Sequence, residues 1–416
     1  MSQQKYRYAL SLSSQIPHCS LPLRLDTYSK CSFRCSYCFA KNRGGNHPPA
    51  GMKVIDTKAL DKLLYRSVED NLAKDTVLLQ MLGRRVPLHF GGMSDPFMHY
   101  EAIGRKSLTT LSILSKYKYP TVISTKGDLL FDDRYLEMIS LGCFAIQLSF
   151  SSLDDNVSSL LEFNTPRPSR RIELIKSLSK LSWVSARLQP MIPGDLDRAK
   201  DNIKVLAAAG VRHVSVEFLK IPFIDSKNQM ATIGKAVGRD LSEYYSQRRT
   251  CGLEFLINEN YALHWHTELI KVARENKISY SSADTDLLPY DASDSCCSGT
   301  AEIEGFGNYY RYTFPQAIRN AIRLGETELK FAHLESEWAP SGSIKHFLNS
   351  KTRIEGINDV CRFMADKWNN SNRTIGPLAF QGISDTDRRD ENGMKIYIIT
   401  DSAFGLAKTL GLNNNI

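Results

Sequence analysis

The chain has 416 residues, a length that fits one large domain and a smaller one. Of these residues 42% are hydrophobic and 24% charged, which is typical of a soluble globular protein. No apolar run is long enough to span a bilayer, and the N-terminal residues lack the apolar stretch of a secretion signal, so we expect a cytoplasmic protein with no membrane partner. The net charge of +8, from 53 basic and 45 acidic residues, weakly favours a polyanionic partner such as nucleic acid.

After an N-terminal extension (1–20), short β-rich runs alternate with amphipathic helical stretches up to about residue 285. In one such stretch Ile172, Ile175, Leu178 and Leu181 recur every three residues, which predicts a helix with that stripe against a sheet. Six β-then-α units in a row predict a parallel sheet and therefore an α/β fold, a partial (β/α)6 TIM-type barrel over 21–285. The predicted strands are 21–29, 85–92, 119–125, 143–151, 183–193 and 213–220, with 252–257 and 277–284 around a helix at 259–276 as candidates to extend or close the barrel.

From residue 286 the alternation stops, and 286–416 is expected to be a C-terminal α+β accessory or cap region. Residues 293–312 have the composition of a loop, and 343–368 has a helical pattern. A polar linker at 369–377 then precedes a final strand at 394–401.

The sequence CSFRCSYC places Cys31, Cys35 and Cys38 immediately after the first predicted strand, at the end where barrel enzymes carry their chemistry. Three cysteines can hold a [4Fe–4S] cluster while one iron keeps no protein ligand and is open to an external chelator. The alternative is a closed zinc site completed by His47, or by His18 and Cys19.

With this cysteine spacing after the first barrel strand, the sequence resembles the radical S-adenosylmethionine (SAM) superfamily. Five further segments occur in the order of its spore photoproduct lyase branch, which includes DNA-repair-photolyase-like proteins. They are HFGGMSDPF (89–97), STKGDLL (124–130), SFSSLDD (149–155), NTPRPSRRIELI (164–175) and RLQPMIPGDLD (187–197).

The resemblance implies two cofactors, a [4Fe–4S] cluster and SAM, with Cys31, Cys35 and Cys38 as the metal ligands. It implies that one electron splits SAM into methionine and a 5′-deoxyadenosyl radical, which abstracts hydrogen from a substrate. It also implies a reducing partner such as flavodoxin or ferredoxin. Tyr37, just before the third cysteine, is assigned to the cofactor site.

Three further candidates for cofactor binding follow the second and third strands. At Gly91 and Gly92 backbone carbonyls could approach the SAM ammonium, although a tight turn also explains the two glycines. Asp95 is either a hydrogen-bond acceptor for SAM or substrate, or a cap of the turn before a proline. Lys126 could pair with the SAM carboxylate or be an ordinary solvated lysine.

Later strands supply the remaining cofactor candidates. Ser149 and Ser151 end the fourth strand and could bind the ribose, or simply pack at a strand edge. Arg187 lies within the fifth strand, where an arginine facing the barrel interior needs an anionic partner. Arg171 opens a helix and could equally be exposed, and Gly194 would let the backbone approach adenine or form an ordinary turn.

Three other cysteines are candidates for handling the substrate radical. Cys143 begins the fourth strand and could be a small buried hydrophobe, whereas Cys296 and Cys297 lie in a loop. The loop pair could donate a hydrogen atom, or join Cys251 and Cys361 around an auxiliary cluster. Spore photoproduct lyase has a hydrogen-donating cysteine early in its barrel, but this chain has no cysteine between Cys38 and Cys143, so thymine-dimer repair is not matched.

Three functions are compatible with this sequence. The first is a radical SAM enzyme acting on DNA, RNA or a nucleobase. The second is a radical SAM isomerase, epimerase or tailoring enzyme acting on a peptide or small molecule. The third is a non-catalytic zinc or iron–sulfur binding module.

Overall fold

The computed structural model describes residues 5–6, 9–13, 15–42, 51–69, 76–245, 249–251, 253–293, 296–301, 303–345, 348, 354–371 and 374–412. It divides into two compact units. Unit 1 consists of Met1–Ala9, Leu25–Lys58 and His89–Tyr280, and unit 2 of Leu10–Arg24, Ala59–Leu88 and Ser281–Ile416. Within the described residues, no helix has the length and apolar character needed to cross a bilayer.

The main sheet contains all six strands predicted from the sequence, and its order is β1-β2-β4-β5-β6-β8-β9-β13. The strand pairs β5–β6, β6–β8 and β8–β9 are parallel, as successive β-then-α units require. The predicted partial barrel is therefore confirmed. The strands are β1 (Leu10–Leu12), β2 (Leu23–Leu25), β4 (Leu88–Phe90), β5 (Thr121–Thr125), β6 (Phe144–Phe150), β8 (Trp183–Met191), β9 (His213–Phe218) and β13 (Ser279–Ser282).

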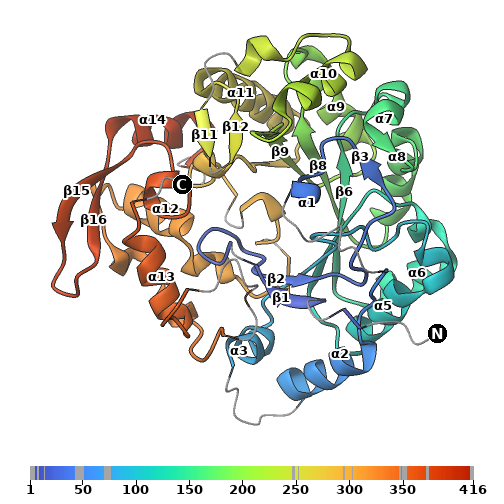
Figure 1. Ribbon diagram of the computed structural model, residues 1–416, viewed down its shortest axis with the longest axis horizontal. Helices are drawn as coiled ribbons and strands as arrows, with labels where there is room; N and C mark the ends of the chain where they lie inside the picture. Colours follow the sequence, from blue (N-terminus) through green and yellow to red (C-terminus); the bar gives the residue numbers. More distant parts are fainter. Residues whose placement is uncertain are drawn as a thin grey trace. The chain divides into compact units, whose positions relative to one another are not determined.

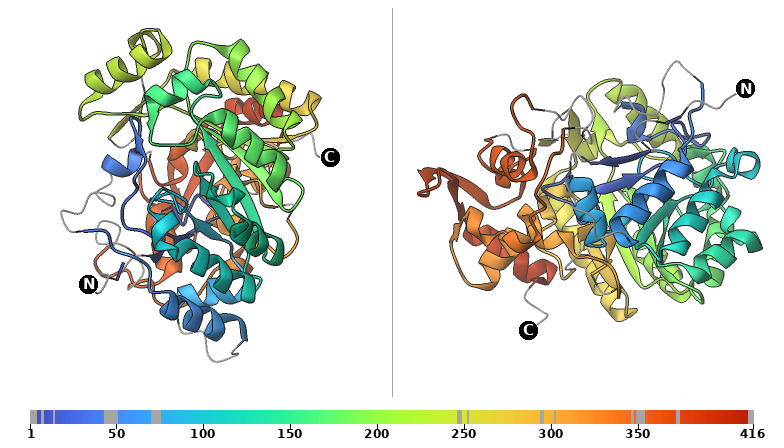
Figure 2. Two further views of the ribbon diagram at one scale, coloured as in Figure 1. Left: turned by 90° about the vertical axis from the view of Figure 1, so that its right-hand side faces the viewer. Right: turned by 90° about the horizontal axis from the view of Figure 1, so that it is seen from below.

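Most helices of unit 1 lie along the outer side of these strands, but the short helix Phe39–Asn42 does not (Figures 1 and 2). In the predicted stripe, Ile175 and Leu178 are fully buried, but Leu181 is 47% exposed. That part of the prediction is wrong because the helix ends at Leu178 and a three-residue spacing drifts around a helix of 3.6 residues per turn. The helices are α1 (Phe39–Asn42), α4 (Glu101–Gly104), α5 (Lys106–Lys116), α6 (Asp133–Leu141), α7 (Asp155–Leu161), α8 (Pro168–Leu178), α9 (Leu196–Ala208), α10 (Ser226–Val237) and α11 (Glu259–Glu275).

The prediction that both 252–257 and 277–284 extend the barrel is half right. The second segment contains β13, the last strand of the main sheet, and the predicted intervening helix is α11. The first contains β12 (Glu254–Leu256), which instead pairs antiparallel with β10 (Ile221–Pro222) and β11 (Arg249–Cys251) in a separate small sheet. Its short apolar run has no feature that distinguishes a barrel strand from a hairpin strand.

The C-terminal region has the predicted α+β character. The antiparallel sheet β14-β16-β15 combines β14 (Glu328–Leu329), β15 (Ile383–Arg389) and β16 (Lys395–Ile399), the last being the predicted final strand (Figure 1). The other helices of the chain are α2 (Thr57–Leu64), α3 (Val77–Gly83), α12 (Phe314–Arg323), α13 (Val360–Trp368) and α14 (Asp401–Leu410).

The helix predicted over 343–368 is shorter than expected. Ser343 forms isolated β-bridges with Thr76 and Asp359, and α13 begins only after Asp359, whose carboxylate caps the helix by accepting from the Arg362 N–H. Gly356 just before it has φ +77, a left-handed conformation that a continuous helix does not contain.

Candidate cofactor and substrate site

The three clustered cysteines lie in the loop that follows β2. Within it, the short strand β3 (Arg34–Cys35) pairs antiparallel with β7 (Glu162–Phe163), so that Cys35 is directly opposite Glu162. The Ser36 N–H donates to the Leu161 carbonyl at 2.8 Å and continues this pairing. A carboxylate far along the chain is thereby held beside the cysteines.

Cys31, Cys35 and Cys38 pack with the apolar cluster of Tyr28, Phe33 and Val54. Burial raises the pKa of Cys35 to about 12, against the opposing effect of the Lys126 charge. Burial and the Asp95 carboxylate likewise raise the pKa of Cys31 to about 12. The thiols of Cys31 and Cys35 are therefore protonated near neutral pH unless a cation displaces their protons.

Glu162 is the centre of a buried network next to these thiols, although no sequence pattern assigns it a role. Its carboxylate accepts hydrogen bonds from the Tyr37 hydroxyl and from the Ser151 N–H at 3.1 Å. Arg171 donates to the second carboxylate oxygen at 2.6 Å. Burial alone would raise the pKa of Glu162, but Arg171 and Lys126 outweigh it and lower this pKa to about 2.

Arg171 is fully buried, so its alternative as an exposed residue is wrong. Besides its ion pair with Glu162, it donates to the Ser149 carbonyl, and its guanidinium carbon lies 4.8 Å from the Phe150 ring centroid. Arg171 thus links α8 to the end of β6. Tyr37 keeps its proton to donate to Glu162, because burial and the Glu162 charge raise its pKa well above the usual value.

Lys126 and Asp95 lie on the same side of this network. The Lys126 Nζ is 3.8 Å from Glu162 and 5.8 Å from the Tyr37 ring centroid, and the side chain is 14% exposed. Asp95 accepts from the Lys126 N–H at 2.6 Å, from the Thr125 hydroxyl and from the Phe97 N–H. Its carboxylate therefore fastens the turn after β4 to the end of β5, the capping role considered from the sequence.

Gly91 ends β4 in a conformation that requires glycine. Its φ is +95, and a Cβ there would lie 2.3 Å from the Ser124 carbonyl oxygen. Gly194, after β8, has φ +107 and donates its N–H to the Tyr261 hydroxyl. Close backbone packing thus explains both glycines. Gly92 follows Gly91 in the same turn.

Large apolar side chains alternate with small or polar ones along β6 and β9, and less regularly along β8, where Trp183 lies opposite Ala145. Phe150, on the apolar face, lies against Arg171 of α8, so the helices cover the apolar face. The opposite, inner face bears Ala145, Gln147 and Ser149 on β6, Ser185 and Arg187 on β8, and Ser215 and Glu217 on β9. Barrel interiors are usually filled by branched apolar side chains, so this polar inner face is unusual.

Hydrogen bonds connect the polar inner face across four strands. The His89 Nε2 lies 2.9 Å from the Ser124 hydroxyl, and this hydroxyl donates to the side-chain amide oxygen (Oε1) of Gln147 at 3.1 Å. Arg187 donates to the same oxygen at 3.4 Å. Among the described residues, the buried Gln147 Nε2, Arg187 Nε, Ser185 Oγ and Ser215 Oγ have no hydrogen-bond partner. Such groups are costly unless a ligand or water satisfies them.

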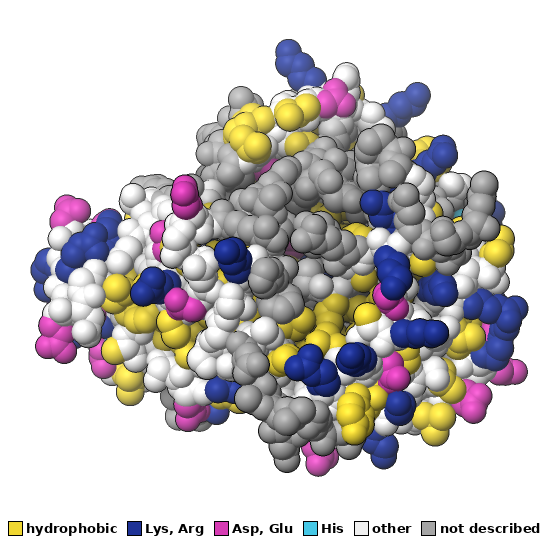
Figure 3. Space-filling model, turned by 60° about the horizontal axis from the view of Figure 1, so that its bottom comes forward, with side chains coloured by type: hydrophobic (Ala, Val, Ile, Leu, Met, Phe, Trp, Pro, Cys, Tyr) yellow, Lys and Arg dark blue, Asp and Glu magenta, His cyan; other side chains and the backbone are white. Residues whose placement is uncertain are grey.

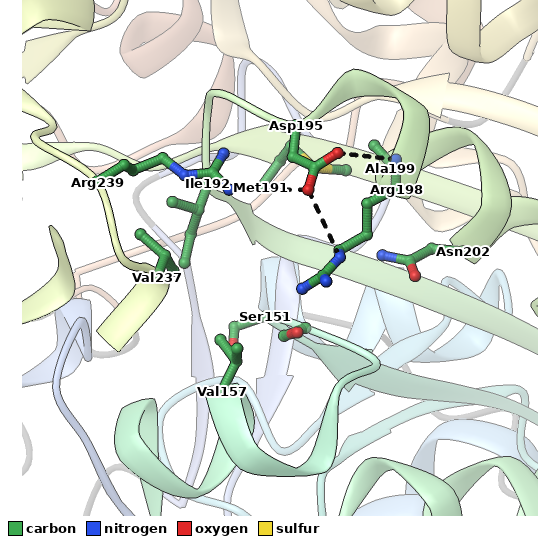
Figure 4. A pocket seen from close by; sticks show the side chains of 11 residues that line it. Ser151, Val157, Met191, Ile192, Asp195, Arg198, Ala199, Asn202, Val237 and Arg239 are labelled. Atoms are coloured by element: carbon green, nitrogen blue, oxygen red, sulfur yellow. Dashed lines mark hydrogen bonds and ion pairs between the residues drawn. The ribbon is translucent and has the colours of Figure 1, made fainter. Parts of the chain in front are cut away.

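A pocket adjoins the Glu162 network at Ser151 (Figure 4). Met191, Ile192, Val157 and Val237 supply apolar surface. Charged side chains lie at its edge, where Asp195 pairs with Arg198 at 3.5 Å and with Arg239 at 3.7 Å. The remaining lining residues are Ser152, Ala199 and Asn202.

Comparison with known proteins shows what this arrangement belongs to. Residues 25–224 match the radical SAM superfamily. The matched segment, 200 of the 416 residues, is a radical SAM domain. It makes the protein a radical SAM enzyme and implies a [4Fe–4S] cluster and SAM as its cofactors.

Three solved structures are similar to the chain to different degrees, all at low sequence identity. A spore photoproduct lyase variant has a TM-score of 0.51 at 13% identity, over 67% of this chain and 80% of that one. Spore photoproduct lyase in complex with a dinucleoside spore photoproduct scores 0.48 at 13% identity, over 66% and 79%. SuiB of Streptococcus suis bound to SAM scores 0.36 at 15% identity, over 64% and 60%. No curated protein matches the sequence.

The residues present fit the radical SAM cofactors. Cys31, Cys35 and Cys38 supply three thiolates, each able to bind a different iron of one cluster. Among the described residues, no three His, Cys, Asp or Glu side chains are placed to hold a single metal ion. A cluster does not require such a placement, because each of its ligands binds a different iron. His47 and the side chain of Cys251 lie outside the described residues.

The other thiols are not part of this network. Cys143 precedes β6, at the amino end of the strand, whereas Ser149 and Ser151 mark its carboxyl end. At about 3.3 Å per residue the two ends of β6 are roughly 20 Å apart, which argues against Cys143 as a hydrogen donor at this site. Cys296 and Cys297 belong to unit 2.

Proposed function

We propose that this radical SAM enzyme acts on a nucleobase, free or within DNA or RNA, and that Cys31, Cys35 and Cys38 hold its cluster. When bound, the cluster and SAM supply a 5′-deoxyadenosyl radical that abstracts hydrogen from the substrate. The observation that carries the substrate class is the polar inner face, together with the spore photoproduct lyase-like order of the motifs.

The Glu162 network positions the cofactor site. Because Glu162 is ionised and fully buried between Arg171 and Lys126, it fixes the Tyr37 hydroxyl and with it the loop of Cys35 and Cys38. Lys126 keeps part of its surface exposed, so its ammonium is the cation that we assign to the SAM carboxylate.

The pocket next to Ser151 fits the adenosine part of SAM. Apolar side chains such as Met191 and Ile192 can pack against a base, while Ser151 offers a hydroxyl to the ribose. Gly194 lies beside it, where a close backbone can approach adenine. Ser149, Gly91 and Gly92 remain candidates for cofactor contacts on the same side of the sheet.

The inner face suits an oxygen-rich planar group. Gln147 Nε2 and the Arg187 guanidinium are donors, and Ser185 and Ser215 add hydroxyls. Donors arranged across neighbouring strands match the carbonyl oxygens of a pyrimidine or purine edge. We therefore reassign Arg187 from cofactor binding to substrate binding.

The net positive charge of the chain is compatible with a nucleic-acid substrate, but it does not identify the surface that would bind the nucleic acid. On the face in Figure 3, Lys and Arg side chains are separated by neutral and acidic ones. The substrate assignment therefore rests on the inner face and not on a surface patch.

The experiment is anaerobic reconstitution with iron and sulfide, reduction with dithionite, and incubation with SAM and deuterated candidates. Thymidine, uridine and short single-stranded DNA and RNA are compared with peptides. We expect deuterium in 5′-deoxyadenosine from a nucleoside or oligonucleotide. Transfer from peptides alone would overturn the substrate class in favour of a peptide-tailoring enzyme.

The variant Gln147→Leu tests the inner face separately. It removes the amide donors while keeping similar volume, so substrate stimulation of SAM cleavage should fall at least about tenfold, whereas cleavage without substrate persists. Gln316→Leu, which removes another buried amide from unit 2, is the matched control. If Gln147→Leu and Gln316→Leu lost substrate stimulation of SAM cleavage equally, a specific role for Gln147 would be excluded.

A further inference from the structure

Three cysteines from two distant segments of the chain meet inside unit 2. The thiol of Cys19 is hydrogen-bonded to that of Cys296, and Cys296 is also hydrogen-bonded to Cys297. Cys296 is 2% exposed, whereas Cys19 and Cys297 are half-buried. Cys296 has φ +50, a conformation that is uncommon for a residue with a Cβ.

A chain of buried hydroxyls ends at this thiol pair. The Ser20 Oγ lies 3.0 Å from the Cys296 Sγ and 2.9 Å from the Ser298 Oγ, and Ser298 lies 2.9 Å from the Thr300 Oγ1. The Leu21 N–H donates to the Cys19 Sγ at 3.4 Å. Hydroxyls that can donate in sequence stabilise negative charge on sulfur.

The two thiols therefore differ in acidity. Burial opposes ionisation of Cys296, but hydrogen bonds from Cys19, Cys297 and Ser20 outweigh it and lower its pKa well below the usual value. The hydrogen bond to Cys296 and then burial raise the pKa of Cys19. These hydrogen bonds favour the negative charge on Cys296 and the proton on Cys19, an arrangement typical of reactive thiol pairs.

Among the described residues, the groups next to these thiols do not complete a metal site. His18 is next to Cys19, but its Nε2 lies 2.6 Å from the Ile375 carbonyl oxygen and its ring packs on Phe380. The Asp291 carboxylate accepts from the N–H groups of Ser282 and Ser293. Because these contacts hold the His18 ring, they disfavour the zinc site with His18 and Cys19 that the sequence left open.

We propose that Cys19 and Cys296 form an oxidation site that hydrogen peroxide converts to a disulfide. The Cys296 thiolate attacks one peroxide oxygen, and a sulfenic acid and hydroxide form as the O–O bond breaks. The Cys19 thiolate, once its proton has passed to hydroxide, attacks the sulfenic sulfur and expels a second hydroxide, which is protonated to water. Two thiols are oxidised and one peroxide is reduced to two waters.

Peroxide is the oxidant that the burial favours. Cys296 is nearly inaccessible, so a bulky disulfide such as glutathione disulfide is excluded by size, whereas peroxide has about the size of a water pair. The resulting bond ties the segment before β2 to the segment around residue 296, so it should raise the unfolding temperature of unit 2.

The test treats the anaerobic holoenzyme with a small excess of hydrogen peroxide, blocks free thiols, and maps linked peptides by mass spectrometry. We expect a dithiothreitol-sensitive link between the peptides of Cys19 and Cys296, retained in Cys297→Ser and in the exposed control Cys361→Ser. In Cys19→Ser the link is lost, and Cys296 should instead carry sulfinic acid. The Cys35→Ala protein, treated in parallel, controls for oxidation driven by cluster iron.

Other outcomes overturn the proposal. They are a Cys296–Cys297 link, unreacted thiols at Cys19 and Cys296, or a bound metal in Cys35→Ala that the added change Cys19→Ser removes. The experiment measures the masses of linked peptides and not SAM cleavage. A failure of the disulfide proposal is therefore independent of a failure of the proposed function.

Discussion

At the scale of single residues, one carboxylate organises the cofactor site. Glu162 contacts Tyr37, Ser151, Arg171 and, at 3.8 Å, Lys126, and it is fully buried. A buried ion pair contributes little net stability, but removing one partner leaves the other charge uncompensated. The site should therefore be sensitive to the charge of Glu162.

Glu162→Gln tests this directly. Because it leaves Arg171 buried without its anion, we expect the free energy of unfolding to fall by about 3 kcal/mol in urea titrations. Glu173→Gln, on the exposed face of the same region, removes a carboxylate from a surface pair with Arg170 and should change stability hardly at all. Equal stability of the two variants would contradict the central role of Glu162.

The pH dependence of stability follows from the same residue. Its pKa is lowered from 4.5 to about 2 on folding, so the stability it contributes is present above pH 4.5 and is lost as pH falls toward 2. The difference in unfolding free energy between the native protein and Glu162→Gln should therefore shrink between pH 5 and pH 2. A difference that stays constant over that range would mean that folding does not lower the pKa of Glu162.

At the scale of elements, short pairings far apart in sequence build the site. The strands β3 and β7 have two residues each, and together they bring Glu162 opposite Cys35. The six barrel strands were predictable because their apolar and β-branched runs recur between amphipathic helices. Glu162 was not, since a two-residue strand carries no periodic pattern. Cys19 was considered only as a zinc ligand beside the clustered cysteines, and its contact with Cys296 depends on the fold of unit 2.

The turn after β4 offers a test at this scale. Gly91→Ala would place a methyl group 2.3 Å from a backbone oxygen at φ +95, so we expect a lower thermal unfolding temperature and a loss of about 2 kcal/mol or more. Gly405→Ala in α14, where a Cβ meets nothing within 4 Å, should be neutral or slightly stabilising. If both variants unfolded at the same temperature as the native protein, the turn at Gly91 would not be strained by a side chain.

At the scale of the whole molecule, the net charge of +8 bears on the substrate. If the substrate is a base within single-stranded nucleic acid, binding should weaken about tenfold between 50 and 200 mM salt, as expected for roughly two to three neutralised phosphates. Fluorescence anisotropy of a labelled oligonucleotide measures this. Salt-independent binding, or none, would restrict the proposal to a free nucleoside.

The most direct test of the account compares the native protein with Cys35→Ala, using Cys143→Ala as a control. After anaerobic reconstitution and reduction with dithionite, iron and 5′-deoxyadenosine are quantified. We expect about four irons per chain and SAM cleavage in the native protein and in Cys143→Ala, and loss of both in Cys35→Ala. Undiminished 5′-deoxyadenosine from Cys35→Ala, or none from the iron-loaded native protein, would contradict the assignment of this cysteine loop.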